Sequence, residues 1–224
     1  MKFVLVHGAW HGGWCWEPLV HELEQLGHDV LAPNLPCDDT DAGLGRYVEV
    51  IGRHPDAVVV AHSLAGLVLP LIEAALHVYL CALVPTPGQP FAGSFDEALD
   101  PAFGGTERDE LGRSYWPSVG VLAERLYRGH DRRWAEWAFA QLRRQAQTPS
   151  REPCPLEELP HTRCAYILAT EDPSVRPAWS RLVARELLGV EPQEIEGGHF
   201  PMLDRPAELA RMLETLTASD RARR

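Results

Sequence analysis

Apolar runs of strand length and segments with helical spacing alternate along most of this chain, and this alternation limits the possible folds more than any other feature. The run over residues 57–61 is apolar at every position, which is typical of a strand buried on both faces of a parallel sheet. Repeated strand–helix units indicate a doubly wound α/β fold, with a mostly parallel sheet of about six strands. The expected strands span residues 2–6, 29–32, 57–61, 78–84, 163–169 and 193–196. The expected helices span residues 17–26, 43–52, 177–188 and 206–216, and a further helix is expected to begin at Ser63.

The alternation lapses between residues 86 and 160, where helical, proline-rich and charged segments follow one another. We predict one domain over residues 1–224, with a small helical cap inserted at about 86–160. Ligands of open α/β sheets bind at the carboxyl ends of the strands, so the cap is expected to lie over that edge. An extra packing layer without a ligand role is the alternative. The segment is rich in aromatic residues, namely Phe91, Phe95, Phe103, Tyr115, Trp116, Tyr127, Trp134, Trp137 and Phe139.

Charge and cysteine content exclude several classes of function. The formal net charge is −11, which disfavours nucleic acid and anionic membranes as partners because phosphate groups would be repelled. The five cysteines are scattered and form no Cys-x-x-Cys pair, so a zinc or redox site has no support. Reduced thiols fit a cytoplasmic location best. The apolar stretch 57–84 is interrupted by polar residues and is not expected to span a membrane.

Ser63 is the candidate nucleophile. It follows the expected strand 57–61, in the sequence Ala61-His62-Ser63-Leu64-Ala65-Gly66. A serine on a sharp turn between strand and helix needs small residues two positions before and two after it, and Ala61 and Ala65 meet that need. No other serine of the chain does. The alternative is that Ser63 only caps the next helix.

His199 is the candidate general base. It follows Gly197 and Gly198 after the last expected strand, at the start of the final helical region. A histidine there can take the serine proton and return it to a leaving group. The chain order serine, acid, histidine is also that of this kind of site. The alternative is a surface histidine that caps a helix.

The acid that orients the base should follow the preceding strand, where Glu171 and Asp172 are adjacent. We favour Asp172, because the second acid falls where the strand has turned toward the site. Glu171 remains the alternative, and a carboxylate beside a proline is also an ordinary turn former.

Two backbone N–H groups are expected to bind a developing oxyanion. One belongs to Leu64, directly after the nucleophile, and the other to Ala9, in the glycine-rich loop after the first strand. His7 is expected to hold this loop by hydrogen bonds. His11 either braces the loop or contacts a ligand.

These motifs together resemble the plant methylesterase and hydroxynitrile lyase branch of the α/β-hydrolases and its bacterial relatives. The resemblance covers nearly the whole chain, is weakest in the cap, and rests on residues 3–14, 61–66, 79–88 and 197–203. It implies the α/β-hydrolase fold, a small helical cap over an apolar pocket, no cofactor, and in many members a homodimer. The chain departs from the pattern in the alanines around Ser63 and in its shorter cap.

The resemblance implies two possible chemistries. Lyases of this branch carry a lysine directly after the catalytic histidine and a hydroxyl residue in the oxyanion loop, where this chain has Phe200 and Ala9. We therefore expect a serine hydrolase that cleaves a small carboxylic ester through an acyl-enzyme. Cyanohydrin cleavage, another non-hydrolytic step such as cyclisation or elimination, and plain ligand binding remain alternatives.

A small-molecule ester is the expected partner, but the residues do not identify it, and thioester, lactone and amide substrates stay open. The aromatic surroundings favour an aromatic or medium alkyl group over a charged one. The expected pocket residues are Trp10, His11, Trp116, Tyr127 and Phe200.

Overall fold

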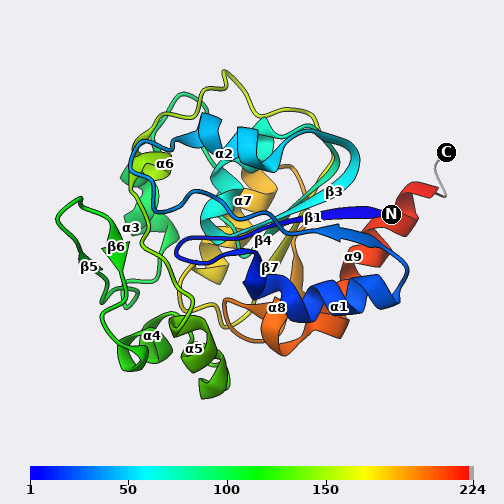
Figure 1. Cartoon of the computed structure of the whole chain (residues 1–224). Coiled ribbons are helices and arrows are strands. Elements are labelled where there is room, and N and C mark those ends of the chain that lie inside the picture. The colour runs from blue at the N-terminus through cyan, green and yellow to red at the C-terminus, as the bar shows by residue number, and fades with distance from the viewer. Residues whose placement is uncertain (222–224) are drawn as a thin grey trace.

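A six-stranded parallel sheet forms the centre of the computed structural model, which describes the backbone of residues 1–221 and the side chains of residues 1–217 (Figure 1). The strand order is β2-β1-β3-β4-β7-β8, and every neighbouring pair is parallel. The predicted α/β-hydrolase fold is confirmed. The strands are β1 (Lys2–Val6), β2 (Asp29–Leu31), β3 (His54–His62), β4 (Ala74–Leu80), β7 (Cys164–Ala169) and β8 (Gln193–Ile195).

Helices cover both faces of the sheet, which explains why its strands are apolar at successive positions. In β1, Phe3 and Leu5 pack into the core under one set of helices, whereas Val4 and Val6 pack into the core on the opposite face. Helices α1 (Glu17–Gln25), α8 (Pro201–Asp204) and α9 (Pro206–Arg221) contribute to the first core. Helices α2 (Leu44–Ile51) and α7 (Pro177–Glu186) contribute to the second.

The chain after Ser63 differs from the prediction of a helix. It forms two short 3-10 turns, η2 (Ser63–Leu67) and η3 (Leu69–Leu71), and then enters β4 at Ala74, earlier than expected. Pro70 lies within η3 and lacks the N–H that a continuing α-helix would need. Strand β4 also ends earlier than expected, because Cys81 has a positive φ of 47°.

The segment over residues 86–160 is mixed rather than purely helical. A two-stranded antiparallel hairpin, β5 paired with β6, lies at its outer edge and was not predicted (Figure 1). Asp109 stabilises the hairpin by ion pairs with Arg113 in the turn and Arg144 beyond it. The elements are η4 (Phe91–Ser94), α3 (Phe95–Ala98), β5 (Glu107–Arg108), β6 (Ser114–Tyr115), α4 (Val119–Arg125), α5 (Arg132–Phe139) and α6 (Thr148–Arg151).

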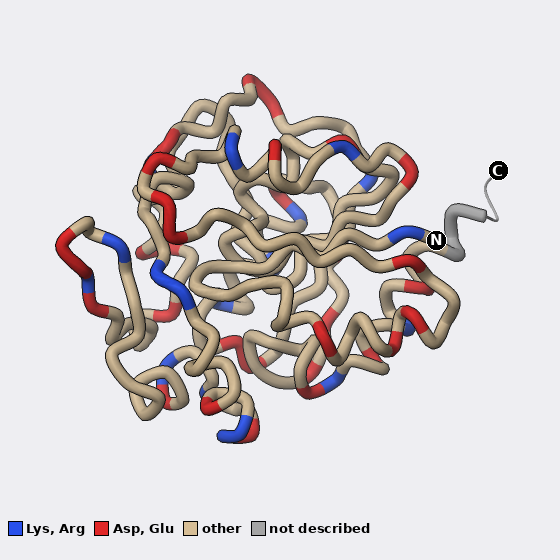
Figure 2. Tube along the Cα trace, viewed as in Figure 1, with Lys and Arg blue, Asp and Glu red and all other residues tan. Residues whose placement is uncertain are grey.

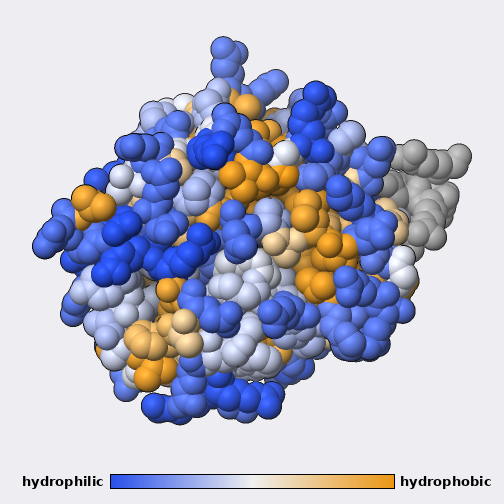
Figure 3. Space-filling view, in the orientation of Figure 1, coloured by the Kyte–Doolittle hydropathy of each residue, from blue (hydrophilic) through white to orange (hydrophobic). Residues whose placement is uncertain are grey.

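Most charged residues lie outside the sheet (Figure 2), and those within its strands are exposed, namely Lys2, Asp29, Asp56 and Glu194. The face shown in Figure 3 is largely hydrophilic, and its hydrophobic side chains form small patches, one of them near α4 and α5. None of the helices described by the structure combines the length and apolar character needed to cross a bilayer.

Candidate active site

Ser63 lies on a strained turn at the carboxyl end of β3. Its φ is +54°, a left-handed conformation that non-glycine residues seldom adopt. The turn leaves little room, since a Cβ on Gly8 would lie 2.7 Å from Ser63 Cβ, and one on Gly66 would collide with the Leu83 carbonyl oxygen. This crowding explains why glycine occupies positions 8 and 66.

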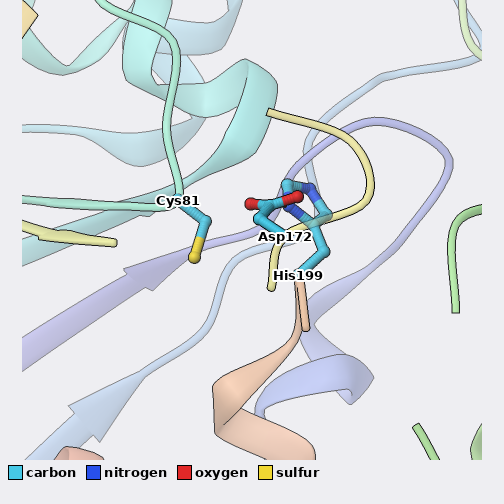
Figure 4. Close-up of side chains that lie close together, drawn as sticks. All are labelled: Cys81, Asp172 and His199. Carbon is cyan, nitrogen blue, oxygen red and sulfur yellow. The ribbon is translucent and has the colours of Figure 1, made fainter. Parts of the chain in front are cut away.

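His199 and Asp172 form a buried pair beside this turn (Figure 4). The distance from His199 Nδ1 to Asp172 Oδ2 is 2.7 Å, and the side chains of both residues are 2% exposed. The other oxygen, Asp172 Oδ1, accepts the backbone N–H groups of Ser174 and Val175 at 2.8 and 2.9 Å. A carboxylate held in this way fixes the tautomer with the proton on Nδ1, which leaves Nε2 of His199 free to accept a proton.

The alternative acid, Glu171, has an exposed side chain, while its backbone N–H donates to the carbonyl of Gly197. Of the two adjacent carboxylates, the structure therefore brings Asp172 to the histidine.

His62 connects the serine turn with the histidine loop. Its Nε2 donates to the backbone carbonyl of His199 at 2.8 Å, and the two imidazole rings lie 4.5 Å apart between centroids. Burial and the neighbouring His199 hold the pKa of His62 well below its ordinary value, so this ring stays neutral. The residue directly before Ser63 thus contacts the residue expected to act as its base.

The loop after β1 approaches the serine from the other side. Ala9 and Leu64, the two predicted oxyanion donors, line the same cavity as Ser63. The loop is held from within, since His7 Nδ1 donates to the Gly8 carbonyl at 2.8 Å and His7 Nε2 accepts the Leu35 N–H at 2.9 Å. Burial lowers the pKa of His7 to about 4, so the neutral ring persists at physiological pH.

The segment 86–160 also holds the loop after β1, through contacts with Trp10. Trp10 has a positive φ of 64°. Its backbone N–H donates to Gln145 Oε1 at 3.3 Å, and its indole N–H donates to Ser114 Oγ at 3.0 Å. Its carbonyl accepts the Arg143 N–H at 2.8 Å. The segment 86–160 therefore helps to set the shape of the loop after β1.

A cavity of about 230 Å³ opens at Ser63. Ser63, Ala9 and Leu64 form one side of it, and residues of the inserted segment form much of the rest. The remaining wall residues are Trp10, Leu83, Phe95, Leu99, Phe103, Thr106, Arg108, Ser114, Gln145, Ala146, Gln147, Ser150 and Ser174.

Of the five predicted pocket residues, only Trp10 is on this wall. The other four are buried behind it. His11 donates to the Ala9 carbonyl at 2.7 Å and contacts the Tyr127 hydroxyl at 2.8 Å, and Tyr127 stacks on Phe200 with ring centroids 4.4 Å apart. Trp116 is also buried and packs edge-on against Trp10 at 5.4 Å. The geometry therefore favours the loop-bracing interpretation of His11.

Sequence reasoning missed most of the cavity wall. Phe95 and Phe103 are among the aromatic residues noted in the segment 86–160. The sequence showed that aromatic residues gather there but not which of them reach the cavity. No feature of the sequence pointed to Arg108, Gln145 or Gln147. The unpredicted hairpin and the chain that follows α5 bring these residues to the cavity.

A second histidine–aspartate pair supports the loop that carries His199. The N–H of Phe200 donates to His130 Nε2 at 3.2 Å, and His130 Nδ1 hydrogen-bonds to Asp204. A Cβ on Gly198 would lie 2.5 Å from His130 Nε2, so glycine lets the ring approach. His130 comes from the segment 86–160, which therefore contacts the loop that carries His199 as well as the loop after β1.

The side chains of Cys81, Asp172 and His199 offer possible metal-ligand atoms, all within 4.8 Å of one another (Figure 4). The donor set suits a metal poorly, because both Asp172 oxygens already accept hydrogen bonds. In the metal-free protein, burial and the neighbouring carboxylate raise the pKa of the Cys81 thiol well above its ordinary value, so the thiol keeps its proton. We interpret Asp172 and His199 as a hydrogen-bonded pair with the Cys81 thiol close by.

The fold and this arrangement of side chains are those of a hydrolase, and comparison with known proteins agrees. The chain belongs to the alpha/beta hydrolase family, which its residues 3–212 match. It is 27% identical to Methylesterase 7 of Arabidopsis thaliana, over 95% of this chain and 94% of that protein. It is 31% identical over 125 residues to the carbendazim hydrolyzing esterase of Nocardioides sp., and this match spans 49% of the esterase and 45% of this chain.

Among solved structures, polyneuridine aldehyde esterase superposes with a TM-score of 0.80, at 21% identity, over 96% of this chain and 98% of the esterase. At that identity the likeness shows the fold alone. The predicted resemblance to the methylesterase branch is confirmed, and relatives that are named esterases and methylesterases are consistent with a carboxylic ester hydrolase.

Proposed function

We propose that this protein hydrolyses a small carboxylic ester through an acyl-enzyme on Ser63. The observation that carries the proposal is the buried His199–Asp172 pair, which contacts the residue next to a strained serine at the end of a parallel strand. Family membership and the esterase relatives support the same class of reaction.

In the first half of the reaction, Ser63 Oγ attacks the ester carbonyl carbon while His199 Nε2 accepts the serine proton. Asp172 stabilises the imidazolium that forms and keeps its proton on Nδ1. The N–H groups of Ala9 and Leu64 donate to the oxyanion. Collapse of the tetrahedral intermediate breaks the bond to the alkoxy oxygen, and His199 passes its proton to the departing alcohol.

In the second half, water attacks the acyl group on Ser63 while His199 accepts a proton from it. The same two N–H groups hold the second oxyanion. Collapse releases the carboxylic acid, and His199 returns the proton to Ser63 Oγ. Every proton is returned, so the residues named account for the whole cycle without a cofactor.

The test is labelling with a fluorophosphonate together with turnover of p-nitrophenyl acetate and butyrate. We expect a phosphonate adduct on the peptide that contains Ser63, and a loss of kcat on the order of 10⁶-fold in Ser63→Ala. Ser118→Ala is the control, since Ser118 only caps α4. Turnover retained by Ser63→Ala would refute the proposal. Cyanide release from mandelonitrile, without labelling of Ser63, would instead indicate lyase chemistry.

A further inference from the structure

We propose that the ester bound here carries an anionic group, such as a carboxylate, at the end remote from the scissile bond, and that Arg108 binds this group. This inference rests on the proposed function and names the class of substrate for the same cavity. The proposed substrate keeps the aromatic or medium alkyl body that the aromatic residues favour. It carries a negative charge at the end far from the ester bond.

The cavity wall combines apolar side chains with one charged side chain. Its apolar part can hold a compact hydrophobic body, since a dry cavity of roughly 150 Å³ already binds benzene, and this cavity measures about 230 Å³. Arg108 carries the only formal charge among the described wall residues. Ser63 and Arg108 line the same cavity, so one small molecule can contact both.

The guanidinium of Arg108 has no carboxylate partner among residues 1–217. Its two hydrogen bonds go to neutral acceptors, the Gly112 carbonyl at 2.9 Å and Gln147 Oε1 at 3.3 Å. An arginine has five N–H donors, so others remain free for a ligand. The neighbouring arginines differ, since Arg113 and Arg144 are both paired with Asp109.

Among the neutral polar side chains of the cavity wall, those of Gln145 and Ser150 are already engaged. Gln145 uses Oε1 for the Trp10 N–H and Nε2 for the Ala146 carbonyl at 2.9 Å. Ser150 Oγ donates to the Gln147 carbonyl at 2.9 Å. The guanidinium is therefore the strongest free donor on this wall, and a carboxylate is the group that matches its planar fork.

The negative net charge of the protein helps to identify the source of any preference for an anionic ester. With a formal net charge of −11, the molecule repels anions at long range, so an anionic ester gains nothing from general steering. Any preference for such an ester must come from a contact at the cavity. Arg108 is exposed, so we expect this preference to be about fivefold, the order found for a solvent-exposed ion pair.

The experiment compares two esters of the same shape, monomethyl terephthalate and methyl 4-methylbenzoate, by the release of methanol. In the unmodified protein we expect kcat/KM to be about fivefold higher for the anionic ester. Arg108→Gln should bring the two values together by lowering only that of the anionic ester. Arg151→Gln is the matched control, because Arg151 is an exposed arginine on α6 that is not on the cavity wall, and it should keep the preference.

Equal kcat/KM for the two esters in the unmodified protein, or an equal preference in Arg108→Gln, would overturn the inference. Binding of both esters to Ser63→Ala, measured by calorimetry, gives the same comparison without turnover. If Ser63 is not labelled and neither ester is cleaved, the proposed function fails. The calorimetric comparison then still decides whether Arg108 selects an anion.

Discussion

Gly8 and Ser63 touch so closely that a single methyl group on Gly8 would lie 2.7 Å from Ser63 Cβ and 3.1 Å from the His62 carbonyl. Gly8→Ala should therefore push the serine turn away from the loop after β1. We expect kcat to fall by about 100-fold or more, the cost of misplacing a reacting group by about 1 Å. The measurement is kcat for p-nitrophenyl butyrate, with circular dichroism to confirm that the fold persists.

Gly45→Ala is the matched control. Gly45 lies inside helix α2, and a Cβ there meets nothing within 4 Å. The substitution should leave kcat unchanged and stabilise the protein by about 0.5–1 kcal/mol, because alanine favours a helix. A similar loss of kcat in both variants would contradict the role given to Gly8.

Asp172→Asn should lower kcat by about 10⁴-fold with little change in KM. The amide can still accept the N–H groups of Ser174 and Val175, but it no longer holds the proton of His199 on Nδ1. Glu171→Gln tests the other carboxylate and should keep most of the activity, since Glu171 is exposed. The reverse ranking of the two variants, in steady-state kinetics, would assign the acid to Glu171.

His130→Ala should leave the Phe200 N–H without its acceptor, in a residue that is 1% exposed. An unpaired buried donor costs about 1–3 kcal/mol, so the histidine loop should shift and kcat should fall about tenfold. His130→Gln keeps an acceptor and should recover part of the loss. The measurement is kcat at saturating substrate. A purely structural role of His130 would lower the stability of the protein without changing this kcat.

Stability should depend on pH through His7. In the folded protein burial lowers the pKa of His7 to about 4, whereas the unfolded chain has the ordinary value near 6.5. Below pH ~6.5 the unfolded state binds the proton first, so this contribution, roughly 3 kcal/mol, is present above pH ~6.5 and is lost as pH falls toward 4. Urea unfolding should show that the cost of His7→Gln shrinks as the pH falls over this range. A cost that stays constant would contradict it.

The sheet was predictable because burial on both faces leaves a continuous apolar signal, as in the stretch Val58–Val59–Val60. The serine turn was equally visible, since crowding by Gly8 and the backbone at Leu83 demands small residues around Ser63. Each of these requirements restricts the type of residue at a given position, so each can be recognised in the sequence.

The helix expected after Ser63 and most of the cavity wall were not predictable in the same way. Apolar residues follow Ser63 whether the chain forms an α-helix or 3-10 turns, and only Pro70 hinted at the difference. The wall is built by the hairpin β5–β6, whose strands are two residues each and too short to show a period. Aromatic residues such as Tyr127 and Phe200 stack on each other rather than face the cavity, a choice that depends on tertiary packing.

The short turns after Ser63 have a consequence for how an oxyanion would be stabilised. A long helix starting at Ser63 would direct the aligned dipoles of its peptide groups, equivalent to about half an elementary charge, at the negative oxygen of the intermediate. In residues 63–73 the chain forms only η2 and η3, so that contribution is small. Stabilisation of the oxyanion in both halves of the proposed reaction should therefore depend on the N–H groups of Ala9 and Leu64 rather than on a helix dipole.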